Sequence, residues 1–188
     1  MNHAKWMMLA VLIMVALFGL APTRASAQTE EQLKQVEAAL PQLARVTPTA
    51  PRRLLIFTGC KGYRHEAIEI GTKTLEMMGG VTGAFTAVAS DDIAMFEPAN
   101  LQQFDAVCFN NSTGDLFLPG NLADLTQEQQ QAAREYDALL KKSLLDFVRG
   151  GKGVIGIHAA TDAWYGWAEY GEMMGGYFWG HPWNEDVV

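Results

Sequence analysis

The sequence predicts an α/β protein built on a doubly wound, mainly parallel sheet with helices on both faces. The first observation is a set of short, largely apolar runs of the kind found in buried parallel strands, at residues 54–57, 85–89, 106–109 and 154–157. The second is that segments with apolar residues at helical spacing separate these runs. Strand–helix alternation of this kind is typical of a parallel sheet.

A short helix is expected before the sheet begins. Thr29 and Gln32 have the spacing of a capping box, and the apolar residues up to Leu40 share one helical face. Three prolines between residues 41 and 51 end the helix. Residues 28–51 are therefore predicted to form a short helix and a proline-containing linker, and the main domain is expected over residues 52–188.

Two longer helices are expected within the domain. The first follows the strand at 54–57, runs from Glu66 to Met78 and is predicted to stop at Gly79-Gly80. The second begins at a capping box formed by Thr126 and Gln129 and ends at Arg149, before another glycine pair.

Residues 1–27 have the three parts of a secretory signal peptide. Lys5 precedes an apolar run, Trp6 to Ala21, and Ala25-Ser26-Ala27 offers a small-residue cleavage site. The run is shorter than the roughly 20 residues that span a bilayer, although an uncleaved anchor is the alternative. We therefore expect export to the periplasm or the medium, with no stable membrane insertion after cleavage.

The composition argues against three classes of protein: nucleic-acid-binding proteins, disordered chains and disulfide-stabilised scaffolds. The chain has 14 Lys and Arg residues against 21 Asp and Glu residues, a net charge of −7, and no basic stripe, which argues against nucleic-acid binding. With 49% apolar and 19% charged residues it is not a disordered chain. Two cysteines do not make a disulfide scaffold. Cys108 is interpreted as a core residue, and Cys60 as either a loop residue or a nucleophile.

Ligands of open parallel sheets bind at the carboxyl ends of the strands, and polar segments follow three of the predicted strands there. These segments are residues 59–66, 110–115 and 158–162. His65 and His158 lie in two of them, and His181 lies further on in a Gly-His-Pro-Trp loop. Histidine serves as a general base or a metal ligand, and three imidazoles suit a divalent metal such as zinc; structural histidines are the alternative.

His158 occupies the position of a nucleophile elbow, a sharp bend between a strand and a helix. Since the residue is neither serine nor cysteine, the pattern excludes a Gly-x-Ser-x-Gly hydrolase. The aromatic residues from Trp164 to Trp183 are dense enough either to fill a core or to stack on sugar rings.

Several of these motifs together resemble the ThuA-like (trehalose-utilisation) family. They are Lys61-Gly62-Tyr63-Arg64-His65-Glu66, Asn111-Ser112-Thr113-Gly114-Asp115, the stretch from Gly151 to Asp162, Tyr170 to Gly176, and Phe178 to Trp183. The resemblance covers about Arg52 to Val188. It implies a flavodoxin-like fold of the class I glutamine amidotransferase-like superfamily and a role in the use of trehalose and related disaccharides. Since such domains continue with further strands, we expect this chain to be C-terminally truncated.

Two hypotheses about function follow from the motifs and the resemblance. In the first, the protein is a hydrolase or isomerase of a disaccharide or keto-sugar, with His158, Asp162 and Glu66 catalytic. The substrate contacts would be Tyr63, Arg64, Asn111, Thr113, Asp115, Trp164 and Trp183, and a metal would be held by His65, His158 and His181. In the second, it is a non-catalytic sugar-binding or interaction module. A truncated chain that folds poorly, with an unpaired strand edge, is a third interpretation.

Overall fold

The computed structural model describes residues 29–182, and the predicted signal peptide and Trp183 lie outside this range. The helices are α1 (Glu30–Ala39), α2 (Ala67–Thr82), α3 (Pro98–Leu101), α4 (Gln127–Arg149) and α5 (Ala168–Met174). The strands are β1 (Arg53–Phe57), β2 (Thr86–Ser90), β3 (Ala106–Asn110) and β4 (Gly153–Ile157). Short 3₁₀ turns lie at Ile93–Phe96, Leu122–Asp124 and His158–Thr161. Within residues 29–182 no helix combines the length and the apolar character needed to cross a membrane.

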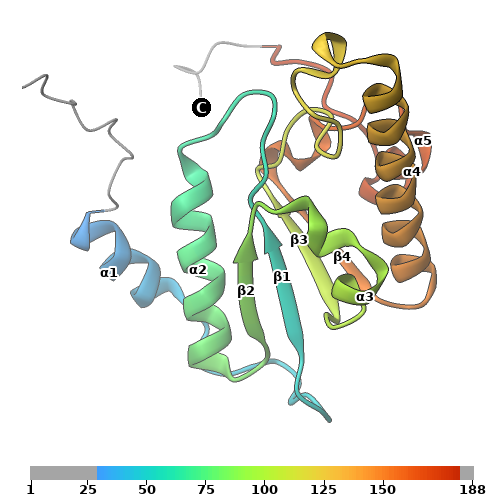
Figure 1. Ribbon diagram of the computed structural model, residues 1–188. Coiled ribbons are helices and arrows are strands. Elements are labelled where there is room, and N and C mark those ends of the chain that lie inside the picture. Colours follow the sequence, from blue (N-terminus) through green and yellow to red (C-terminus); the bar gives the residue numbers. More distant parts are fainter. Residues whose placement is uncertain (1–28, 183–188) are drawn as a thin grey trace, which may run out of the picture.

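The four strands form one parallel sheet in the order β2-β1-β3-β4 (Figure 1). The chain moves from β1 outward to β2, and then returns to the other side of β1 to form β3. The switch point of this flavodoxin-like arrangement therefore lies between β1 and β3, where such sheets place their ligands. The predicted doubly wound α/β fold is confirmed.

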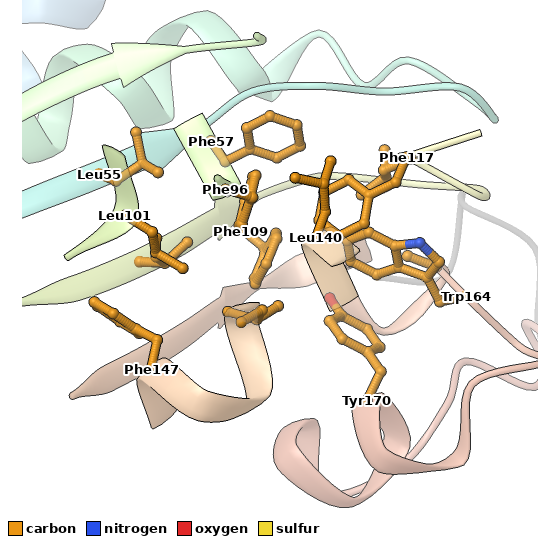
Figure 2. Close-up of a cluster of buried hydrophobic side chains, with 14 of the residues drawn as sticks. Leu55, Phe57, Phe96, Leu101, Phe109, Phe117, Leu140, Phe147, Trp164 and Tyr170 are labelled. Carbon is orange, nitrogen blue, oxygen red and sulfur yellow. The ribbon is translucent and has the colours of Figure 1, made fainter. Parts of the chain in front are cut away.

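The larger core fills the sheet face that α4 covers, and it is rich in aromatic rings (Figure 2). Leu55 and Phe57 of β1 meet Leu140 and Leu144 of α4 there, and all four side chains are fully buried. Side chains alternate between the two faces of a strand, so the neighbours of Leu55 point to the opposite face. Phe57 and Phe109 bring this aromatic layer to the carboxyl ends of β1 and β3.

A smaller core lies on the face that α2 covers, where Leu54, Ile56 and Cys108 are buried. Burial raises the pKa of the Cys108 thiol to about 12, so the group stays protonated at neutral pH. The interpretation of Cys108 as a core residue is confirmed.

Both predicted capping boxes are present, at the start of α1 and at the start of α4. The expected end of α2 at Gly79-Gly80 is wrong, because the helix continues to Thr82 and ends at Gly83, whose φ is 64°. A Cβ at Gly79 would lie 2.6 Å from the Phe85 carbonyl oxygen. Gly79 therefore lets α2 approach the chain that enters β2, and it does not end the helix.

β4 lies at one edge of the sheet, as β2 lies at the other, and it is the more exposed of the two edge strands. Ile155 is 44% exposed on the face that carries the smaller core. The expectation that the run at 154–157 is covered on both faces is therefore wrong for this strand. The helix on this face, α2, makes its contacts with β2 and β3.

Candidate functional site

A cleft of about 420 Å³ lies at the carboxyl end of the sheet. Its walls come from three segments: the loop after β1, the turn after β4, and the chain that follows α5. The lining residues are Tyr63, His65, His158, Ala159, Thr161, Asp162, Phe178 and His181. The sequence prediction that polar segments converge at this edge is confirmed for the first and second of these walls. The volume falls within the range of roughly 300–1,000 Å³ that is typical of small-molecule sites.

The three described histidines all line this cleft. The rings of His65 and His158 meet edge to face with their centroids 4.7 Å apart, and Tyr63 packs on the other side of His65 with its ring centroid 4.8 Å away. His181 packs against Phe178 at 5.0 Å. Two imidazoles from strands on either side of β3 therefore lie in direct contact.

The electrostatic surroundings of His65 favour its neutral form. Desolvation lowers its pKa below the usual value of 6.5, the charges of His158 and His181 lower it further, and Asp162 opposes the shift. A neutral imidazole can accept a proton, so His65 has the character of a base at neutral pH.

The backbone is strained where two of the strands enter the site. His158 directly follows β4 with a φ of 50°, and Asn111 directly follows β3 with a φ of 56°. Left-handed φ values are uncommon outside glycine and gather at functional sites. The predicted sharp bend at His158 is therefore present, and it brings the imidazole to the surface of the cleft.

Asp162 is held in place by Tyr165, which the sequence analysis did not single out. The Tyr165 hydroxyl lies 2.6 Å from Asp162 Oδ1 and 3.0 Å from the Phe178 carbonyl oxygen, and the hydrogen bond to Asp162 raises the pKa of Tyr165 to about 12. The Phe178 amide also donates to the Thr161 carbonyl over 3.0 Å. These bonds join the segment that carries His181 to the turn that carries Asp162.

Two predicted substrate contacts lie beneath the cleft. Asn111 is 1% exposed and Thr113 is fully buried, so the expectation that they line the rim is wrong. The Asn111 side-chain amide donates to Asn110 Oδ1, and the Thr113 hydroxyl donates to the Tyr63 carbonyl. The Asn111 amide therefore bonds to the last residue of β3, and the Thr113 hydroxyl bonds to the loop after β1.

Four other predicted residues also lie apart from the cleft lining. Trp164 is 1% exposed and packs in the larger core (Figure 2). Arg64 forms an ion pair with Glu69 over 2.8 Å. Glu66 is exposed at the start of α2, and Asp115 is exposed beyond the buried end of β3.

The described residues contain no group of three His, Cys, Asp or Glu side chains placed to hold a metal ion. His65 and His158 make contact edge to face, whereas His181 packs on Phe178. A metal site formed by the three histidines stays a prediction.

Cys60 does not have the surroundings of a nucleophile. Its Sγ lies 3.1 Å from the Tyr63 carbonyl oxygen and 3.0 Å from Thr113 Oγ1. Neither partner is a base, and the thiol lies outside the lining of the histidine cleft. Its contacts are those of a loop residue.

Thr161, Phe178 and Tyr165 were not predicted as site residues. Thr161 and Phe178 lie in the motif segments, and Tyr165 lies in the aromatic stretch from Trp164 to Trp183. Thr161 belongs to the run after β4, and Phe178 precedes the Gly-His-Pro-Trp loop. Thr161 could have been predicted as a lining residue because it lies shortly after a predicted strand. Nothing in the sequence distinguished Tyr165 from its buried neighbour Trp164.

The sheet order defines a flavodoxin-like α/β protein, and its histidine-lined cleft lies at the carboxyl ends of the strands. The model of the ThuA family, described as trehalose utilisation, matches residues 53–188. The chain therefore belongs to the ThuA family, and its role is related to trehalose utilisation. Neither the curated proteins nor the solved structures include a match to this chain.

Proposed function

We propose that this protein is exported and that its cleft binds a trehalose-related disaccharide, or the keto form of one, and acts on it by histidine acid–base chemistry. The observation that carries the proposal is the direct contact of His65 and His158 inside a cleft that is also lined by the aromatic side chains of Tyr63 and Phe178. Its family is the reason to choose a carbohydrate ligand.

The exposed aromatic side chains support a sugar ligand. Among the described residues they are Tyr63, Tyr165 and Trp179, which are 71%, 53% and 99% exposed. Tyr63 lines the cleft, Tyr165 binds Asp162, and Trp179 follows the lining residue Phe178. Aromatic faces beside polar groups offer the mixed surface that a sugar ring needs.

The chemistry that this site supports is proton transfer between a sugar and two imidazoles. His65, whose pKa is lowered, accepts a proton from water or from a sugar hydroxyl. His158, which lies in contact with His65, is the proposed acid: in its protonated form it donates a proton to the sugar, and exchange with water then restores both imidazoles. Acid–base steps in both hydrolysis and isomerisation use one group that takes up a proton and another that donates one.

A non-catalytic sugar-binding module is the second candidate, and one observation favours it. Asp162 accepts its hydrogen bond from Tyr165, and within residues 29–182 no hydrogen bond joins this carboxylate to a histidine. An acid that orients a catalytic histidine would form that bond. Binding of a disaccharide without turnover would support this candidate.

The test is calorimetric titration of trehalose, other disaccharides and their keto forms, with analysis of the products. His65→Gln removes the proposed base, and Lys142→Gln on the exposed side of α4 is the control. We expect binding by the wild type and the control, and loss of turnover in His65→Gln. Absence of binding across the whole panel would contradict the proposal.

Export is tested separately from chemistry. The N-terminal segment with Ala25-Ser26-Ala27 supports cleavage before Gln28. The full chain would be expressed in a bacterium and the N-terminus of the purified protein sequenced. A product that begins at Gln28 agrees with export, and one that retains Met1 does not.

A further inference from the structure

We propose that the dipeptide Thr113-Gly114, which lies just beyond β3, holds two of the three walls of the cleft, the loop after β1 and the turn after β4, and thereby sets the contact between His65 and His158. Thr113 is fully buried and cannot touch a ligand. Its role is that of a positioning residue, and its importance for sugar binding rests on the proposed function above.

Thr113 fixes the first wall, the loop that carries Tyr63 and His65. Its carbonyl accepts hydrogen bonds from the amides of Lys61 and Gly62, over 2.9 Å and 3.1 Å. Its hydroxyl donates to the Tyr63 carbonyl over 2.9 Å. Three hydrogen bonds from one buried residue thus determine where the loop passes.

Gly114 fixes the second wall, the turn that carries His158 and Asp162. Its amide donates to the Asp162 carbonyl over 2.9 Å, and its carbonyl accepts from the Trp164 amide over 3.3 Å. These bonds form a short parallel bridge between Gly114 and Ala163. The two walls are therefore held by adjacent residues of a single segment.

Glycine is required at this junction because the two loops are in close contact. A Cβ at Gly114, where φ is 86°, would lie 2.9 Å from the Gly62 amide nitrogen. A Cβ at Gly62 would lie 2.9 Å from Thr113 Oγ1. Any side chain here would push the first wall away from the second.

The main test compares Thr113→Val, which removes the hydroxyl, with Thr113→Ser, which keeps it. Thr82→Val is the matched control, because Thr82 also donates its hydroxyl to a carbonyl, that of Met78, but lies at the opposite end of the sheet. The readouts are the nuclear Overhauser effect between the His65 and His158 rings in histidine-labelled protein, the affinity for the best disaccharide, and the melting temperature.

We expect Thr113→Val to weaken the ring–ring signal at least two-fold and disaccharide affinity about ten-fold, since misplaced contact groups lose much of their effect. Thr113→Ser and Thr82→Val should keep both. An unchanged signal and affinity in Thr113→Val would overturn the proposal.

If Thr113→Val fails to fold, Gly62→Ala tests the proposal instead. Its added methyl group would lie against the Thr113 hydroxyl and displace the same loop. A signal and an affinity at the wild-type level in Gly62→Ala would then overturn the proposal, and reduced values would support it. A ring–ring signal that depends on Thr113, in a protein that binds no disaccharide, would support the positioning role and contradict the proposed function.

Discussion

Two hollows of nearly equal volume lie at opposite ends of the sheet. The histidine cleft measures about 420 Å³, and the hollow at the amino ends of β1 and β2 measures about 430 Å³. The second is lined by Arg52, Glu76 and three glycines, among other residues, and contains no histidine. The two hollows therefore differ in the side chains that line them and not in volume.

The backbone distinguishes them as well. At the amino ends of the strands, left-handed φ values fall on Gly83 and Gly151, which adopt them without strain. At the carboxyl ends they fall on Asn111 and His158, and on Trp164 shortly after β4. Among residues 29–182, left-handed φ values in residues with side chains therefore occur only at the end with the cleft, which is typical of functional sites.

The largest effect expected from this comparison is that of His158→Asn. Asparagine tolerates a left-handed φ, so the variant removes the imidazole and keeps the bend. We expect disaccharide turnover to fall about 10²- to 10⁴-fold, the usual contribution of a general acid or base. Glu76→Gln, in the other hollow, is the control and should keep wild-type turnover. Equal losses in both variants would remove the functional distinction between the two ends.

Gly83→Ala should lower the stability of the protein and leave disaccharide binding unchanged. A Cβ at Gly83 meets no atom within 4 Å, so its cost comes from the φ of 64° alone. We expect the free energy of unfolding to fall by about 1 kcal/mol. Chemical denaturation measures this loss, and disaccharide affinity should not change. A change in disaccharide affinity would mean that the hollow at the amino ends of the strands influences binding in the histidine cleft.

Trp179→Ala should have a smaller effect, on binding only. Trp179 is 99% exposed, so its removal takes no apolar area out of a core. We expect disaccharide affinity to fall about five-fold through loss of the aromatic face, with an unchanged melting temperature. Leu43→Ala removes another exposed apolar side chain outside the cleft lining and is the control. A loss of affinity in the control would show a general surface effect.

The smallest expected effect is a dependence of stability on pH. Because the pKa of His65 is lowered in the folded protein, the unfolded chain binds more protons near and below the usual pKa of 6.5. Stability should therefore decrease as the pH falls from about 7 towards 5. Thermal melts across this range should show a smaller decrease in His65→Gln than in the wild type. A larger decrease in the variant would contradict the lowered pKa.

The fold could be predicted because its signals are local. The apolar runs gave β1, β3 and β4, and Thr29 and Thr126 marked the first residues of their helices through capping boxes. The end of α2 could not be predicted, because the role of Gly79 depends on contact with Phe85, which lies outside the helix. Local glycine patterns do not carry such tertiary information.

The site was predicted in part. His65, His158, Asp162 and His181 do meet in one cleft, because parallel strands bring their carboxyl ends together. Thr113 was misplaced because a polar residue at a strand end was expected to face solvent. Its burial depends on partners in another loop, the Tyr63 carbonyl and the Lys61 amide, which the sequence does not reveal.

The position of β4 at the sheet edge gives the two walls of the cleft different local stabilities. β1 and β3 are paired on both sides and largely buried, whereas β4 is paired with β3 and largely exposed. Amide hydrogens of β4 should therefore exchange with solvent through local opening, well before those of β1 and β3. A sugar held by both walls would slow exchange in β4 the most, because it would bind only the closed form.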